Sequence, residues 1–331
     1  MILTKNLIIN RISFYFKRNS NLSYTPPRIR LSSKMFLDRT RLLILYLTVN
    51  LPLIMVTTAS VQPSNDHKIK NKNSTQEISS LIVVDVQNCF ISGNLALIDS
   101  PAKQEGADVV PIINHLLQTV SFDVIIYTHD WHPTDHISFY QNLNKRRQYL
   151  LGDQNKNYSL FDTVTYKGPL VQTEQVLWPL HCIQNTNGAK LHKDLIVESK
   201  SNVFHVRKGL NPDVDSYSAF WDNNKQQKTD LDSILRRWNV THVYVTGLAT
   251  DYCVAATALD AIDLKYTTYL VEDACRGVSL ETIDKKKQEM KQRGITFVQS
   301  SQVKALVDGA ICNRIYLILM SFSIVVSFLL K

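Results

Sequence analysis

The sequence lacks any net charge over most of its length. Nine of its 37 lysine and arginine residues fall within residues 1–60, where Asp38 is the one acidic residue. The other 28 basic residues are matched by 28 acidic residues, so the formal net charge of +8 comes from the first 60 residues. Charge therefore gives no indication of a nucleic acid or an acidic partner. The sequence also has no internal repeat or low-complexity region, which argues against a repeat architecture.

Cysteine is scarce, with 5 residues in a chain of 331. Cys312 lies in a hydrophobic C-terminal segment, which leaves four for the folded part of the chain: Cys89, Cys182, Cys253 and Cys275. We interpret Cys253 as a nucleophile, which cannot be held in a disulfide, and Cys182 and Cys275 as structural residues. At most one disulfide among the other three cysteines is therefore compatible with activity.

Hydrophobic segments lie near both ends of the chain. Residues 42–58 hold no charged residue, which favours the core of a signal peptide within a leader at 1–60. A signal anchor and a mitochondrial presequence are the alternatives. Residues 315–330 form an apolar tail within the segment 309–331, which favours a GPI-attachment signal over a tail anchor.

Glycosylation sequons favour the same route through the cell. They begin at Asn73, Asn157 and Asn239, and sequons matter only in the secretory pathway. We therefore expect an outward-facing protein at the cell surface. A lipid attached between Ser300 and Ala310, or a hydrophobic end of the chain, would anchor it in the membrane.

The folded domain is expected at residues 78–308, after a polar linker at 61–77. The expected strands are 81–85, 124–128, 202–206, 242–246, 267–271 and 296–299. The expected helices are 104–120, 230–238, 252–262 and 280–293. Short apolar strands separated by helices indicate the α/β class, with a three-layer fold in which helices cover both faces of a parallel sheet.

Three reactive side chains stand at the ends of these elements. Asp85 closes the first strand, Lys208 follows the third, and Cys253 lies at the start of a helix. Strand ends meet at one edge of a parallel sheet, so the three side chains can share a crevice. Unpaired N–H groups at a helix N-terminus favour a thiolate. The set is typical of a thiol-dependent amidase.

One carboxylate and two imidazoles form a second candidate set. Asp130 and His132 follow the second strand, and His181 comes later in the segment WPLHCIQ. Such a set suits one divalent metal ion, with zinc preferred over iron or manganese and positions left open for water or substrate. The alternative is that Asp130 caps a turn and both histidines are ordinary polar residues. Spacing alone does not choose between the two interpretations.

Five segments carry a family resemblance. They are VDVQNCF, HDWHPTDHISF, WPLHCIQ, RKGLNPDVDSYSAF and GLATDYCV, in this order. Over residues 78–300 the chain resembles the nicotinamidases of the isochorismatase-like cysteine hydrolase superfamily. The resemblance implies a six-stranded Rossmann-like sheet and the hydrolysis of nicotinamide to nicotinate and ammonia.

The resemblance also implies roles for the reactive residues. It makes Asp85, Lys208 and Cys253 the catalytic triad, with a thioester formed on the cysteine. The backbone N–H groups of Ala249 and Cys253 would form the oxyanion hole. A cis peptide bond between Leu248 and Ala249 is implied next to it.

The resemblance makes Asp130, His132 and His181 the metal ligands, with His136 as a possible fourth. The chain departs from the family at one motif position, because Cys89 stands where the family usually has aspartate. This change removes no member of the triad. The metal chemistry and the nucleophile are therefore both expected to be intact.

Aromatic residues at Phe90, Trp131 and Tyr217 match positions that line the substrate pocket in the family. Two alternatives to a nicotinamidase remain: another amide hydrolase of the same superfamily, and a surface binding protein that has lost turnover. The intact triad argues against the second. A homo-oligomer is compatible with the sequence.

Overall fold

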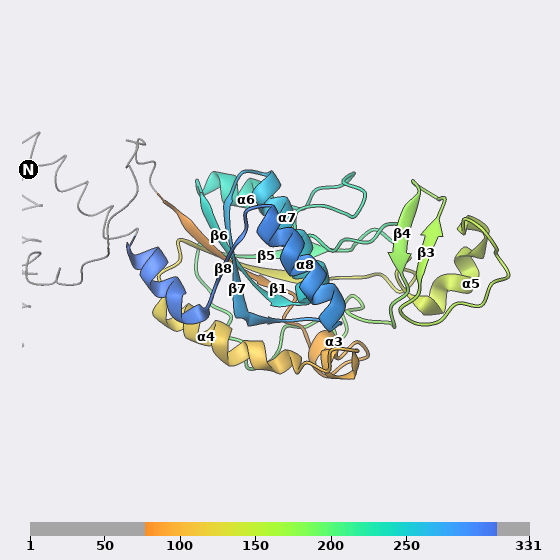
Figure 1. Ribbon diagram of the computed structural model, residues 1–331, viewed down its shortest axis with the longest axis horizontal. Helices are drawn as coiled ribbons and strands as arrows, with labels where there is room; N and C mark the ends of the chain where they lie inside the picture. The colour runs from red at the N-terminus through yellow and green to blue at the C-terminus, as the bar shows by residue number, and fades with distance from the viewer. Residues whose placement is uncertain (1–76, 310–331) are drawn as a thin grey trace, which may run out of the picture. The chain divides into compact units, whose positions relative to one another are not determined.

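The computed structural model describes residues 77–309 (Figure 1). The predicted leader lies outside this range, as do all but the last residue of the predicted linker and all but the first residue of the predicted tail. Within residues 77–309, no helix is both long enough and apolar enough to cross a membrane.

Six parallel strands form the central sheet, in the order β5-β2-β1-β6-β7-β8. They are β1 (Ser79–Val84), β2 (Val124–Asp130), β5 (Val203–Lys208), β6 (His242–Leu248), β7 (Thr267–Arg276) and β8 (Thr296–Val298). The prediction of a six-stranded parallel sheet is confirmed. Strands β2 and β5 extend beyond their apolar segments, so that Asp130 and Lys208 are the last residues of each and lie opposite one another.

Helices cover both faces of the sheet because side chains alternate along each strand. Leu81 and Val83 point into a core shared with α4 (Val109–Thr119). Ile82 and Val84 point into the opposite core, shared with the other helices. These are α6 (Leu231–Arg237), α7 (Ala255–Asp263) and α8 (Leu280–Gln292). The predicted three-layer arrangement is therefore present (Figure 1).

A second small unit of structure was not predicted. Strands β3 (Thr163–Tyr166) and β4 (Thr173–Val176) form an antiparallel hairpin near α5 (Leu143–Arg146) (Figure 1). Its own core is formed by Ile137, Leu143, Leu150, Val164, Tyr166 and Leu177. The shorter elements are α3 (Asn88–Ile91), four 3-10 turns (Leu97–Asp99, Gly106–Asp108, Tyr140–Asn142, Arg147–Tyr149) and one π-turn (Thr250–Val254).

Residues 300–309 are helical, which overturns one prediction. Ser300 begins this segment, and its backbone N–H and hydroxyl both donate to the carboxylate of Asp273. Val303 and Val307 are buried in the same core as α4. A lipid attachment site at Ser300 would remove these core residues from the domain. The attachment site predicted near this end of the range is therefore wrong.

Candidate active site

The sheet brings Asp85, Lys208 and Cys253 to one edge. Asp85 follows β1 directly, Lys208 ends β5, and Cys253 lies in the turn after β6. Gly247 permits this close approach, because its φ is +110° and a Cβ there would lie 2.0 Å from the carbonyl oxygen of Val84. The side chains of all three candidate residues are buried.

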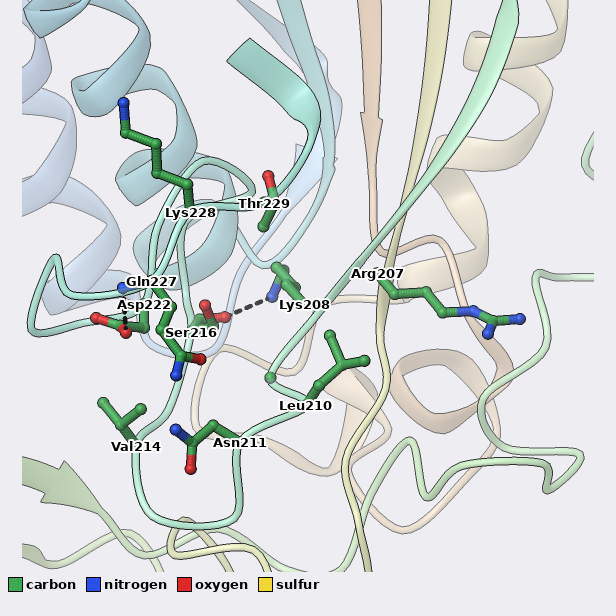
Figure 2. Close-up of a pocket in the computed structure, with 11 residues that line it drawn as sticks. Arg207, Lys208, Leu210, Asn211, Val214, Ser216, Asp222, Gln227, Lys228 and Thr229 are labelled. Carbon is green, nitrogen blue, oxygen red and sulfur yellow. Dashed lines mark hydrogen bonds between the residues drawn. The ribbon is translucent and has the colours of Figure 1, made fainter. Parts of the chain in front are cut away.

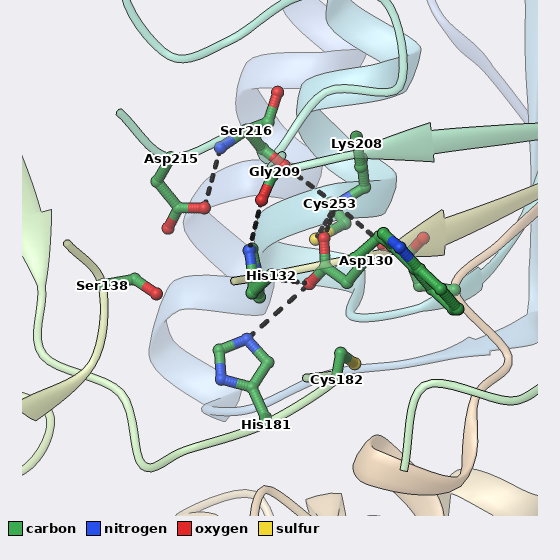
Figure 3. A network of polar contacts seen from close by, with 12 residues as sticks. Asp130, His132, Ser138, His181, Cys182, Lys208, Gly209, Asp215, Ser216 and Cys253 are labelled. Atoms are coloured by element: carbon green, nitrogen blue, oxygen red, sulfur yellow. Dashed lines mark hydrogen bonds and ion pairs between the residues drawn. The ribbon is translucent and has the colours of Figure 1, made fainter. Parts of the chain in front are cut away.

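Lys208 stands at the centre of a polar network (Figure 3). Its Nζ lies 2.9 Å from Asp85 Oδ2 and 2.5 Å from Asp130 Oδ1. The same ammonium donates to the carbonyl of Ser216 at 2.9 Å and to Cys253 Sγ at 3.3 Å. The lysine therefore contacts both other members of the predicted triad and, in addition, one residue of the predicted metal set.

The network sets the charge of each group. Burial raises the pKa of Asp85 above its usual value, although Lys208 opposes this effect. Burial would also raise the pKa of Asp130, but Lys208 and His132 hold it well below its usual range. Burial alone would lower the pKa of Lys208, and the two carboxylates outweigh it, so the lysine stays protonated.

The expected thiolate at Cys253 is not what the structure favours. Burial raises the pKa of this thiol well above its usual value, and the opposing effect of Lys208 is smaller. Cys253 lies in the π-turn Thr250–Val254, which runs directly into α7 at Ala255, so it stays at the start of the helix, where the helix terminus does not outweigh burial. The resting cysteine is therefore a thiol, which needs a base to become a nucleophile.

Asp130, His132 and His181 converge as predicted for a metal site. Asp130 Oδ2 lies 3.4 Å from His132 Nε2 and 3.7 Å from His181 Nε2. The Nδ1 of His132 faces the carbonyl of Gly209 at 3.0 Å, and that of His181 faces the carbonyl of Pro179 at 2.8 Å. A carbonyl only accepts, so each Nδ1 carries a proton and each Nε2 faces Asp130. Burial alone would lower the pKa of His132, but Asp130 raises it above its usual value.

This arrangement fits a divalent metal ion. The Nε2 atoms of two imidazoles and an ionised carboxylate are ligands that such ions take once any Nε2 proton is displaced, and the carbonyls behind the rings fix their orientation. Gly209 has a φ of +68°, and a Cβ there would come within 2.3 Å of the His132 ring. Glycine is therefore required for the ring to occupy its place.

His136 belongs to a neighbouring group of potential ligands. It is buried, its ring centroid lies 4.0 Å from that of His132, and its Nδ1 lies 2.7 Å from Ser138 Oγ. It can form a second set with His132 and Asp215, whose donor atoms lie within 4.8 Å of one another. Sequence analysis missed Asp215, although it lies inside the quoted motif RKGLNPDVDSYSAF.

A pocket joins the thiol to the metal set. Its walls include Cys253, Asp130, His181 and Asp215 together with aromatic side chains. The aromatic residues are Phe90, Trp178, Tyr217 and Tyr252. Phe90 and Tyr217 were predicted here, whereas Trp178 and Tyr252 were missed.

Trp131 was predicted in this pocket, but the structure does not bring it there. Its ring lies 4.2 Å from the guanidinium of Arg207, and it is not among the residues that line the pocket. A second hollow lies beside Lys208 and is lined by residues such as Asn211 and Asp222 (Figure 2). Cys253 and the predicted metal ligands do not line that hollow, so the candidate site is the aromatic pocket.

The remaining expectations about the backbone and the cysteines are met. The Leu248–Ala249 peptide bond is cis. Cys89 and Cys182 form a disulfide, whereas Cys253 and Cys275 are free and buried. The one disulfide among the described residues therefore leaves the candidate nucleophile available.

The fold and this site define a class of protein: hydrolases with a three-layer α/β fold and a candidate cysteine nucleophile at the edge of the sheet. The Isochorismatase domain model matches residues 79–302, so the chain belongs to the isochorismatase family. This agrees with the resemblance seen in the five sequence motifs.

Relatives with known names are similar over most of their length. The chain is 39% identical to a nicotinamidase of Acinetobacter baylyi over 228 residues, which cover 68% of this chain and 94% of the relative. It is 35% identical to a nicotinamidase of Saccharomyces cerevisiae over 232 residues, covering 67% and 99%.

Solved structures give the same result. An Acinetobacter baumanii nicotinamidase has a TM-score of 0.58 and 37% identity, covering 70% of this chain and all of that one. The yeast nicotinamidase bound to the inhibitor nicotinaldehyde has a TM-score of 0.57 and 33% identity, covering 67% of this chain and all of that one.

The predicted location at the cell surface is wrong. The two named relatives are matched over 94% and 99% of their own lengths, which leaves almost no room in them for a leader or tail like those predicted here. The helix at residues 300–309 also argues against attachment at Ser300, the near end of the predicted range. Asn157 and Asn239 are exposed and Asn73 lies outside the described residues, and the relatives give no support to glycosylation at these positions.

Proposed function

We propose that the chain is a nicotinamidase that hydrolyses nicotinamide to nicotinate and ammonia. The observation that carries this proposal is the shared pocket of Cys253 with Asp130 and His181, two of the three candidate metal ligands. The pocket offers a thiol for the carboxamide and a metal set for the ring. The identity with nicotinamidases over nearly their whole length supports the same substrate.

Cys253 would act as the nucleophile and Asp85 as the base. A carboxylate oxygen of Asp85, one of Asp130 and the sulfur of Cys253 all lie within 4.8 Å of one another. A proton can therefore pass from the thiol to Asp85 as Sγ attacks the amide carbon. Asp85 would then return this proton to the leaving nitrogen, which departs as ammonia. The raised pKa of Asp85 suits a group that must first accept and then donate a proton.

Lys208 would keep the charges in balance during these steps. Its ammonium contacts Asp85, Asp130 and the sulfur of Cys253, so it stabilises the developing thiolate as the thiol proton leaves. The backbone N–H groups of Ala249 and Cys253 would donate to the oxyanion of the tetrahedral intermediate. Water then hydrolyses the thioester and releases nicotinate.

Asp130, His132 and His181 would hold one divalent metal ion, for which we propose zinc, with iron or manganese as alternatives. When bound, such an ion supplies a Lewis acid that orients the pyridine nitrogen and draws electron density from the ring. The ring of His136 packs against that of His132 at a centroid distance of 4.0 Å and would support it.

The aromatic residues would form the walls that hold the ring. Tyr252 lies edge to face with Trp178 at a centroid distance of 4.8 Å and close to Tyr217 at 5.4 Å. Trp178 Nε1 donates to the hydroxyl of Tyr217 at 3.3 Å, which fixes both side chains. Phe90 would close the pocket opposite this group, next to His181. Such walls favour a flat heteroaromatic substrate.

The test is ammonia release from nicotinamide by the purified full-length chain, with Cys253→Ala and Cys275→Ala compared directly. Both variants remove one buried free thiol, but only Cys253 lines the pocket. We expect background turnover from Cys253→Ala and near wild-type turnover from Cys275→Ala. Hydrolysis of another carboxamide without hydrolysis of nicotinamide would refute the substrate, and turnover by Cys253→Ala would refute the mechanism.

A further inference from the structure

The Cys89–Cys182 disulfide joins two walls of the active site, because each cysteine is next in sequence to a site residue. Cys89 precedes Phe90 of the aromatic wall, and Cys182 follows His181 of the metal set. The rings of Phe90 and His181 lie 5.6 Å apart. We propose that this disulfide is a positioning element that holds His181 and Phe90 in place, and that opening it weakens metal and substrate binding.

The segment that contains Cys182 braces both histidines of the metal set. The carbonyl of Cys182 accepts the backbone N–H of His132 at 3.1 Å, and the backbone N–H of Gln184 donates to the carbonyl of His132 at 2.9 Å. His181 enters the same set through its side chain. A shift of this short segment would therefore move one metal ligand directly and loosen the support of the other.

The backbone at Cys182 needs such a restraint. Its φ is +44°, in the left-handed region that non-glycine residues seldom adopt. Residues keep this conformation when surrounding contacts determine it. The carbonyl contact with His132 and the covalent link to Cys89 both act on this one residue.

The other half of the bond, Cys89, lies in the short helix α3, whose first residues are held by hydrogen bonds. The backbone N–H of Asn88 donates to Lys190 and that of Cys89 to Gly188, both at 2.9 Å. Gln87 donates its side-chain amide to the carbonyl of Asp130 and accepts the N–H of the same residue. Cys89 is thus fixed relative to the metal set, and the disulfide transfers that restraint to Cys182.

Chemical opening of the bond can be written with balanced atoms. A phosphine attacks one sulfur, the S–S bond breaks, and water supplies two protons to the two thiols and its oxygen to the phosphine oxide. Two electrons pass from phosphorus to the sulfurs. The free thiols no longer hold Cys182 against Cys89, so the segment with His181 can relax.

The test measures zinc affinity and turnover separately in the full-length chain. We compare the wild type with the double variant Cys89→Ala/Cys182→Ala, which opens the bond without adding new thiols at that position, and with Cys275→Ala as a control for loss of a buried cysteine. Zinc dissociation constants come from competition with a chromophoric chelator. The kcat and KM for nicotinamide are measured at saturating zinc, and all assays are run well below the melting temperature of each variant.

We expect the double variant to bind zinc roughly 10–100-fold more weakly, the range found when support of a metal ligand is lost. Its KM should rise while kcat at saturating zinc changes less. Phosphine treatment should weaken zinc binding by the wild type to the same level, leave the double variant unchanged, and be reversed by reoxidation. Cys275→Ala should bind zinc like the wild type.

A double variant with wild-type zinc affinity and KM but a lower melting temperature would overturn the proposal, because the bond would then be a stabilising link only. The measurement of KM rests on the proposed nicotinamidase function, whereas the measurement of zinc affinity does not. Absence of nicotinamide turnover in the wild type would therefore refute the function and leave the zinc comparison valid. Unchanged zinc binding with normal turnover would refute the disulfide proposal alone.

Discussion

Replacing Lys208 with methionine tests the centre of the network most directly. The lysine side chain is 0% exposed and its Nζ lies 2.9 Å from Asp85 and 2.5 Å from Asp130. Methionine is similar in length and apolar, so Lys208→Met removes the charge with little change in volume. Two carboxylates are then left in the protein interior without their cation.

The expected loss of stability is large. Removing one partner of a buried ion pair costs about 3–5 kcal/mol, because the remaining charge is left uncompensated. In a domain of this size each kcal/mol lowers the melting temperature by about 2–4 °C, so we expect a decrease of roughly 6–20 °C. Lys225→Met is the matched control, because Lys225 also pairs with a carboxylate, Asp260, at 2.5 Å, but its side chain is 57% exposed. The control should lose at most about 1 kcal/mol.

The sign of the pH dependence follows from the carboxylates. Without Lys208, burial raises the pKa of Asp85 further above its value in the unfolded chain. A folded-state pKa above the unfolded value means that the folded protein binds more protons than the unfolded chain. The contribution of this group to the free energy of unfolding is therefore complete at low pH and is lost as pH rises through the folded-state pKa. The deficit of Lys208→Met relative to wild type should therefore be smaller at acidic than at neutral pH.

Urea unfolding of both variants and the wild type at pH 5 and pH 7.5 measures these differences. A deficit at neutral pH no larger than that of Lys225→Met would refute the buried network. An equal deficit at both pH values would refute the role assigned to the uncompensated carboxylates. Turnover of nicotinamide by Lys208→Met should fall to background, because the developing thiolate loses its cation.

Three further changes have defined outcomes. Thr128→Val removes a hydroxyl that donates to Asp85 at 2.6 Å and lowers its pKa, so the acid limb of kcat/KM should move to higher pH; a fixed limb would exclude Asp85 as the base. Dialysis against a chelator should abolish turnover and zinc should restore it; full activity of protein shown to be metal-free by elemental analysis would exclude the metal role. Trp178→Leu should raise KM more than it lowers kcat, and an unchanged KM would exclude an aromatic wall at this position.

The sheet could be predicted because its strands are continuous apolar segments with polar residues at their ends. The strand ends were less accurate for the same reason. Hydrophobicity stops at Thr128 and Val206, yet pairing continues for two more residues in each strand and brings Asp130 opposite Lys208. The hairpin β3–β4 was missed because its strands are short and half exposed, so they carry no apolar run.

The candidate site was predicted only in part, although the residues that were missed lie inside the same five motifs. Trp178, Tyr252 and Asp215 each belong to a quoted motif, but a motif does not tell which of its side chains turn toward the pocket, since that depends on the folded backbone. Trp131 was placed in the pocket by resemblance, whereas its ring packs on Arg207 of the neighbouring strand. The thiolate at Cys253 was expected from the helix terminus and from Lys208, and burial outweighs the effect of the lysine.

Asp130 shows why the triad and the metal set cannot be treated as separate parts. One of its oxygens, Oδ1, accepts from Lys208, and the other, Oδ2, faces the Nε2 atoms of both His132 and His181. Any change in the charge of this carboxylate therefore acts on the ammonium that contacts Cys253 and on the ligands of the metal at once. An Asp130 variant would lose both the metal site and the contact with Lys208, so its phenotype could not be attributed to either one. Variants of His181 and of Lys208 separate the two effects, because each residue contacts a different oxygen of the same carboxylate.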